Sequence, residues 1–208
     1  MKRESASFQR EKDYWTVNAL KSIGVDEVGR GCLAGPVVAG AVMFDWSHQQ
    51  PIIDLAKRFP IRDSKTLNRN QRKETAAAIR SIALSVAVAE IDAVEIDEIN
   101  ILKATLKAMR IAVESLERLG VVLVDGNQRI PLLDLPQETI IGGDNKIFSI
   151  AAASIVAKEY RDTLMEKFDE QYLGYDFSSH KGYGTKKHSN AIRAIGLSPI
   201  HRKTFWHG

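Results

Sequence analysis

The sequence contains little cysteine, and this excludes several kinds of site. A single Cys stands among 208 residues, so neither a disulfide framework nor a Cys-based zinc site is expected, and a reducing compartment is indicated. Long apolar runs of about 18 residues are also missing, which argues against a membrane-spanning helix. The charged N-terminal segment lacks the apolar stretch of a secretory signal. We therefore expect a cytoplasmic protein without a membrane partner.

Acidic residues are missing from the C-terminal part of the chain. Residues 177–208 hold four of the five His and no Asp or Glu, and their six basic residues are Lys181, Lys186, Lys187, Arg193, Arg202 and Lys203. The rest of the chain carries a slight acidic excess. A local basic surface of this kind indicates binding to a polyanion, although a solvated basic tail would give the same pattern.

Hydrophobic patterning predicts an α/β fold. We expect strands over 22–28, 37–44, 82–91, 121–124 and 139–141, and helices over 70–80, 92–119, 147–172 and 186–195. Pro51 and Pro60 bound a segment, 46–60, that we expect to be irregular. This order predicts a mixed sheet flanked by helices, with a helical C-terminal extension. We expect a lead-in segment over 1–20 and a single domain over 21–208, including a basic helical part from about 177.

Acidic side chains interrupt or end three apolar stretches. Asp26 and Glu27 lie within GVDEVG, Asp125 follows VVLV, and Asp144 follows IIGG. Burying a carboxylate at the end of a strand is costly unless it is paired or binds a cation. A glycine beside each site permits a tight turn, so the carboxylates can converge from different strands. One such Asp would be an ordinary cap, but three with the same arrangement predict a shared site.

Clustered carboxylates without Cys or His partners favour Mg²⁺ or Mn²⁺ over zinc. Two such ions suit the in-line displacement of a phosphoryl group. Without metal, mutual repulsion should raise the pKa values of the acids. Asp26 is the best candidate to contact both ions, because strand pleating directs Glu27 to the opposite face unless the strand bends.

A dinucleotide-binding fold is a competing interpretation of the glycine-rich loop. Residues 29–34, GRGCLA, match the outline G-x-G-x-x-A after a strand. Pro36 follows at once, however, and a strand-like run stands where the helix should begin. We therefore reject this interpretation.

The motifs DEVGRG, DSKTL, VDG, GGD, AAASIVAK and HKGYGT occur in this order. With them the chain resembles the ribonuclease HII family from Gly24 to the closing GLSPIHRKTF. The resemblance implies a ribonuclease H-like catalytic domain with a five-stranded mixed sheet. It also implies hydrolysis of the RNA strand of RNA/DNA hybrids, and nicking on the 5′ side of single ribonucleotides in duplex DNA, as in DNA replication and repair. Two divalent ions, Mg²⁺ or Mn²⁺, are the implied cofactors.

The resemblance also implies roles for particular residues. The catalytic and metal-binding acids are Asp26, Glu27, Asp125 and Asp144. The loop Gly29-Arg30-Gly31 reads the ribose 2′-hydroxyl, and Tyr183 stacks on the sugar of the next deoxynucleotide. The expected phosphate contacts are Ser64, Lys65, Ser154, Lys158 and Thr185. We expect a monomer that binds RNA/DNA hybrid and ribonucleotide-containing duplex DNA, with no protein partner assigned.

Two other functions are compatible with the acidic sites alone. One is a carboxylate-rich metal phosphatase acting on small phosphate esters, which leaves the basic tail unexplained. The other is a non-catalytic module that binds hybrids.

We expect structural or surface roles for most of His180, His188 and His201, and an ordinary helix-surface position for Asp162.

Overall fold

The fold is built on a mixed five-stranded sheet, as the sequence predicts. The computed structural model describes residues 6–18, 21–62, 64, 67–116 and 120–208. The sheet order is β3-β2-β1-β4-β5, and the strands are β1 (Ser22–Val28), β2 (Val37–Met43), β3 (Ser85–Ile91), β4 (Val121–Asp125) and β5 (Gln137–Ile140). Strand β1 runs antiparallel to β2 and parallel to β4. Strand β2 pairs antiparallel with β3, and β4 pairs parallel with β5.

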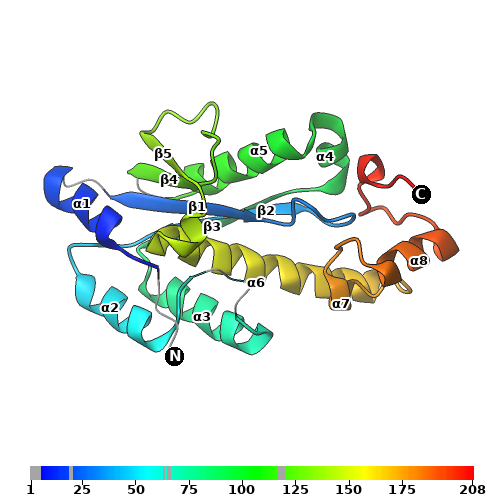
Figure 1. Ribbon diagram of the computed structural model, residues 1–208, viewed down its shortest axis with the longest axis horizontal. Coiled ribbons are helices and arrows are strands. Elements are labelled where there is room, and N and C mark those ends of the chain that lie inside the picture. The colour runs from blue at the N-terminus through cyan, green and yellow to red at the C-terminus, as the bar shows by residue number, and fades with distance from the viewer. Residues whose placement is uncertain (1–5, 19–20, 63, 65–66, 117–119) are drawn as a thin grey trace.

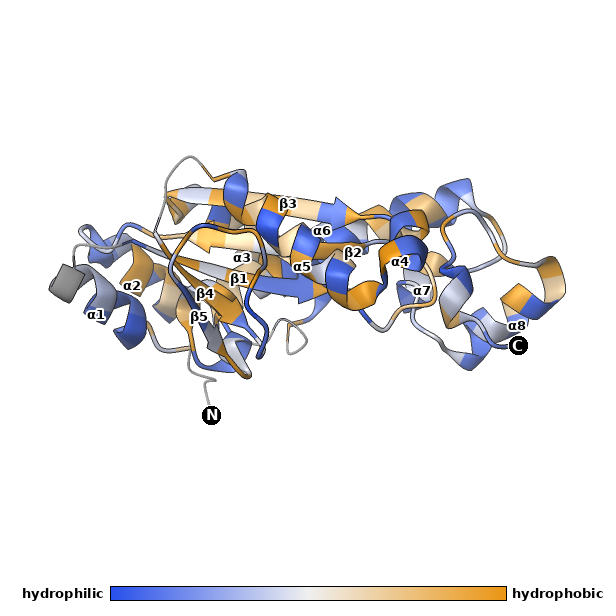
Figure 2. Cartoon of the chain, turned by 90° about the horizontal axis from the view of Figure 1, so that it is seen from above, coloured by the Kyte–Doolittle hydropathy of each residue, from blue (hydrophilic) through white to orange (hydrophobic). Residues whose placement is uncertain are grey.

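Helices cover both faces of the sheet (Figure 1). On one face lies α5 (Ile101–Glu114), with α4 (Ala93–Ile99) beside it. On the other lies the long α6 (Phe148–Gln171), which is covered in turn by α2 (Gln49–Arg58) and α3 (Arg69–Ile82). Figure 2 shows hydrophobic residues gathered on the central strands. The sheet is therefore buried between two layers, and its strand ends are the places where polar side chains can gather.

Elements at the two ends of the chain extend beyond the sheet (Figures 1 and 2). At one end lies α1 (Gln9–Asn18), within the expected lead-in segment. At the other lie α7 (Phe177–His180), α8 (Lys186–Ile195) and a short 3₁₀ helix, Lys203–Phe205. Helix α8 has the predicted bounds, whereas the single turn of α7 was not predicted. None of the helices in the described ranges is both long and apolar enough to cross a membrane.

The prediction of an irregular segment over 46–60 is wrong, because α2 occupies Gln49–Arg58. Pro51 is the third residue of this helix, and a proline is tolerated in the first turn because its missing N–H would have no partner within the helix. Ile52 and Leu55 are buried against the second core. Burial of this apolar face stabilises the helix, although Pro51 and Pro60 led to the prediction of an irregular segment.

The prediction of one helix over 92–119 is also wrong, because Asn100 divides it into α4 and α5. Asn100 has φ 69°, and its side chain caps α5 by accepting a hydrogen bond from the Lys103 N–H. Asparagine tolerates positive φ better than most residues, which makes it suited to such a break. Helix α5 ends at Glu114, and residues 117–119 lie outside the described part of the chain.

Candidate active site

Two of the predicted acids follow from the pairing of β1 with β4. Val25 of β1 lies beside Val124 of β4, so the next residues, Asp26 and Asp125, leave the same edge of the sheet. Each offers a carboxylate oxygen to a group that also includes Glu27, and these oxygens lie within 4.8 Å of one another. The structure therefore brings together three of the four acids selected from the sequence.

Glu27 joins this group although it is adjacent to Asp26 in the strand. The pairing of β1 with β4 ends at Val25, so Glu27 has no neighbour in β4 and lies near the end of β1. A glutamate at an open strand end can turn its longer side chain around the edge. Alternation along a strand thus does not separate the two carboxylates here.

The pKa values of Asp26, Glu27 and Asp125 are raised, in the direction that the clustering predicts. Burial, together with the negative charges of Glu27 and Asp125, raises the pKa of Asp26 well above its usual value. Burial also raises the pKa of Glu27, opposed by the Arg30 guanidinium. The pKa of Asp125 is raised by burial and by Asp144, although the Gly143 N–H opposes the shift. Such a site favours the binding of cations.

Asp144 lies beside this group but is not one of the three. It belongs to a 3₁₀ helix, Gly143–Asn145, that follows β5. The N–H of Gly143 donates to Asp125 Oδ1 at 2.7 Å, which fixes the turn against the end of β4. Asp26, Glu27, Asp125 and Asp144 all line one cavity of about 110 Å³. The four acids therefore face a common space.

Other predicted residues line the same cavity, namely Ser64, Ser154, Lys158 and Tyr183. The hydroxyls of Ser154 and Ser64 are hydrogen-bonded at 3.1 Å. The Lys158 Nζ lies 5.9 Å from the centre of the ring of Tyr183, a residue that is 38% exposed. Lys65 lies outside the described residues. Thr185 is exposed and caps α8 by accepting the His188 N–H.

The predicted recognition loop contains two glycines with different surroundings. Gly29 has φ 92°, and a Cβ there would lie 2.3 Å from Nε of Arg161, so only glycine suits the position. A Cβ on Gly31 would meet nothing within 4 Å, so nothing in the folded chain requires its small size. Between them, Arg30 is half exposed and its Nη1 lies 3.6 Å from Glu27 Oε1.

Two buried arginines hold the loop and the residues that follow it, 29–36, and neither was expected from the sequence to have a role. Arg202 donates through Nη2 to the carbonyl of Gly29 and through Nη1 to that of Arg30, at 2.7 and 2.8 Å. Arg161 donates to the carbonyls of Ala34, Pro36 and Lys181. Burial lowers the pKa of Arg202 to about 10. Their positions in AAASIVAKEYRD and SPIHRKTF were available as a signal, but their burial depends on tertiary packing.

Three histidines form a buried network behind Tyr183. His188 Nδ1 lies 3.0 Å from the carbonyl of Tyr183, and its Nε2 lies 3.0 Å from Nε2 of His201. His201 Nδ1 accepts the N–H of Ser198. With both rings neutral, His188 donates to Tyr183 and His201 donates to His188. His180 stacks on His188 at 4.3 Å between ring centres. These contacts favour the structural role expected for the histidines.

A profile described as Ribonuclease HII matches residues 23–207. The chain belongs to the ribonuclease HII family. It is 49% identical over 196 residues to a ribonuclease HII of Chloroherpeton thalassium, covering 94% of each chain. It is 48% identical over 198 residues to that of Chlorobium luteolum, covering 94% of this chain and 93% of the relative.

The fold agrees with this assignment. The crystal structure of the ribonuclease H2 from Pyrococcus horikoshii OT3 superposes with a TM-score of 0.74 at 26% identity, covering 90% of this chain and 94% of that one. A ribonuclease HII is a ribonuclease H, a nuclease that acts on RNA/DNA hybrids. The family assignment thus decides against both alternatives, the small-ester phosphatase and the non-catalytic module.

Proposed function

We propose that this ribonuclease HII also nicks duplex DNA on the 5′ side of single embedded ribonucleotides, using two divalent ions. The observation that carries the proposal is the approach of the Asp26, Glu27 and Asp125 oxygens to within 4.8 Å, in a cavity that Tyr183 also lines. Hydrolysis would leave a 3′-hydroxyl and a 5′-phosphate. The product is one that a repair pathway for ribonucleotides in DNA could use.

The donor set fits hard divalent cations. Its groups are carboxylate oxygens. Burial with mutual repulsion raises the pKa values of Asp26, Glu27 and Asp125, so a bound cation would relieve an unfavourable concentration of charge. Asp26, Glu27, Asp125 and Asp144 would hold Mg²⁺ or Mn²⁺. The ions would supply activation of water and stabilisation of the leaving oxygen. The protein orients the ligands, since Gly143 fixes Asp125 and the Glu27 N–H donates to Asp26 Oδ1 at 2.7 Å.

Recognition of the ribose would come from the loop and from Tyr183. The open space above Gly31 lets a sugar approach the backbone of the loop, and the half-exposed Arg30 lies at its rim. An antiparallel bridge between Cys32 and Tyr183 fixes the loop relative to the ring. In this proposal the ring would stack on the following deoxyribose. Lys158 and the hydroxyls of Ser64 and Ser154, which line the cavity, would contact phosphate.

A labelled duplex with one ribonucleotide tests the proposal directly, in the presence of Mg²⁺ or of Mn²⁺. We expect one nick 5′ of the ribose, and the same duplex made wholly of DNA, as the matched control, should stay intact. Cleavage of a continuous RNA/DNA hybrid alone would refute the junction activity while leaving the hybrid activity in place. Varying the two ions in parallel would show which one supports turnover better.

A further inference from the structure

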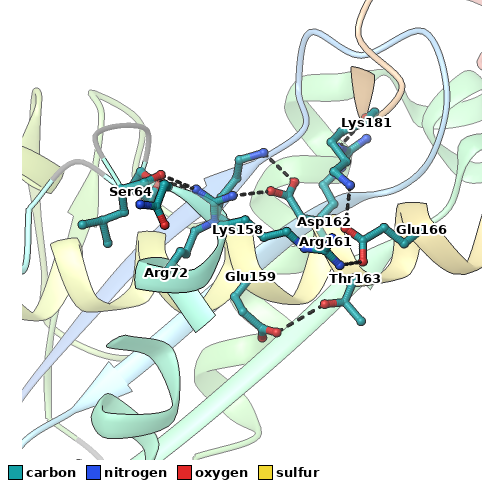
Figure 3. A network of polar contacts seen from close by, with 12 residues as sticks. Ser64, Arg72, Lys158, Glu159, Arg161, Asp162, Thr163, Glu166 and Lys181 are labelled. Carbon is teal, nitrogen blue, oxygen red and sulfur yellow. Dashed lines mark hydrogen bonds and ion pairs between the residues drawn. The ribbon is translucent and has the colours of Figure 1, made fainter. Parts of the chain in front are cut away.

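Asp162 is not on an ordinary helix surface, so this expectation from the sequence is wrong. The residue is 6% exposed and lies one turn after Lys158 on α6. Its Oδ1 accepts from Lys158 Nζ at 2.5 Å, and its Oδ2 accepts from Arg72 Nη2 at 2.8 Å. Figure 3 shows the carboxylate between the two cationic side chains. One acid therefore joins α6 to α3.

The Arg72 side of this contact reaches the segment that carries Ser64. Arg72 Nη1 donates to the carbonyl of Leu67 at 2.9 Å and to that of Ser64 at 3.3 Å (Figure 3). Ser64 is 4% exposed and its hydroxyl meets that of Ser154 at the cavity wall. The position of Ser64 thus depends on the guanidinium that Asp162 holds.

The Lys158 side reaches the cavity itself. Lys158 lines it together with Asp26 and Tyr183, and the side chain of Lys158 is 13% exposed. A lysine has a flexible four-carbon stem and no preferred direction for its charge. The contact with Asp162 limits the ammonium group to one place beside the Tyr183 ring.

We propose that Asp162 is a positioning residue for the cleavage reaction, holding Lys158 from one side and the Ser64 segment from the other. This inference rests on the proposed function of the cavity. Asp162 itself does not line that cavity, so it acts through the two cationic side chains. Its loss would leave Arg72 and Lys158 as neighbouring, poorly solvated positive charges without a counter-ion.

A double-mutant cycle with Lys158 separates positioning from a general effect on folding. We expect Asp162→Asn to lower kcat/KM on the single-ribonucleotide duplex by at least about 10-fold in the native background. In the Lys158→Met background the same change should cost less than about 3-fold, because Lys158 is already absent and only the contribution through Arg72 and the Ser64 segment remains. Thermal unfolding of each variant shows whether it is folded at the assay temperature.

Glu159→Gln is the matched control, since Glu159 is a carboxylate on the same helix that accepts from Thr163 Oγ1 at 3.2 Å. It should keep native turnover. If Asp162→Asn does not fold, Asp162→Glu keeps the charge but moves the carboxylate, and the same cycle is measured with it, with a loss of at least about 3-fold expected in the native background. Equal losses with and without Lys158 would overturn the inference. A native enzyme that leaves the duplex intact would instead refute the proposed function, and this inference with it.

Discussion

Asp26 is the most deeply buried of the four acids that face the cavity, at 5% exposed. Burial raises its pKa, and the negative charges of Glu27 and Asp125 raise it further. An asparagine at this position keeps the shape of the side chain but removes one negative charge from the group. The loss should therefore fall on the chemical step and leave the binding of nucleic acid largely intact.

We expect Asp26→Asn to lower kcat by about 100-fold or more, which corresponds to about 3 kcal/mol of transition-state stabilisation. The measurement is single-turnover cleavage of the single-ribonucleotide duplex, with binding followed separately by fluorescence anisotropy. Asp134→Asn, which changes an acid that does not line the cavity, serves as the control. Turnover close to native in Asp26→Asn would remove this residue from the metal site.

Tyr183 combines a ring available for stacking with a backbone held by His188. Tyr183→Ala should lower cleavage at a single ribonucleotide more than it lowers binding to plain duplex DNA, because the proposed stacking of the ring is on the junction sugar. Tyr183→Phe keeps the ring and should retain most of the activity. Cleavage rates and binding affinities of both variants are compared on the two duplexes. An equal loss of cleavage and binding in Tyr183→Ala would contradict stacking at the junction.

Helix α6 organises much of the site, and α1 contributes to its start. Glu11 of α1 is fully buried, and its Oε1 accepts from the N–H of Ser149 at 2.9 Å in the first turn of α6. Its Oε2 has no hydrogen-bond partner among the described residues. Burial raises the pKa of Glu11 to about 7, although the Ser149 hydrogen bond opposes this. The lead-in segment thus provides a side-chain contact that α6 lacks at its own N-cap.

The raised pKa of Glu11 predicts how stability depends on pH. Its folded pKa of about 7 exceeds the ordinary glutamate value of 4.5, so its contribution is fully present below about pH 4.5 and is lost as the pH rises through 7. The variant Glu11→Gln cannot ionise at this position. Its free energy of unfolding, relative to that of the native protein, should therefore increase as the pH rises from 5 to 8. Urea unfolding at the two pH values measures this. A difference independent of pH would show that Glu11 does not titrate in this range.

The histidine network predicts the opposite dependence on pH. Burial, with the neighbouring His188, lowers the pKa of His201 to about 4 from the ordinary histidine value of 6.5. Its stabilising contribution is therefore present above pH 6.5 and is lost as the pH falls towards 4. We expect the native protein to exceed His201→Gln in unfolding free energy by at least about 1 kcal/mol at pH 7.5, with a smaller margin at pH 5. Urea unfolding of both proteins measures the margin, and an unchanged margin would contradict this account of the network.

Local pattern was sufficient to predict several elements and insufficient for others. Strand β1 and helix α8 have the bounds expected from the sequence, because hydrophobic patterning is a local signal. The helix containing Pro51 and the break at Asn100 depend on burial and on a single backbone conformation, which the pattern does not contain. The same limit explains why Asp162 was assigned to the surface.

In the folded molecule, the basic C-terminal part lies beside the acidic cavity. Arg202 from that part supports the recognition loop, and Tyr183 lines the cavity. The sequence predicted that strand-end acids would meet, and a resemblance was needed to name the substrate. The burial of Arg161 and the histidine network could be recognised only once distant segments were brought together in space. The monomeric state and the single-domain organisation stay predictions.

Anomalous scattering from crystals soaked in Mn²⁺ tests the central claim most directly. We predict Mn²⁺ peaks within ligand distance of Asp26, Glu27 and Asp125, with Asp144 completing the site, and their loss in Asp26→Asn. Crystals that diffract well but show Mn²⁺ only elsewhere on the surface would contradict the account.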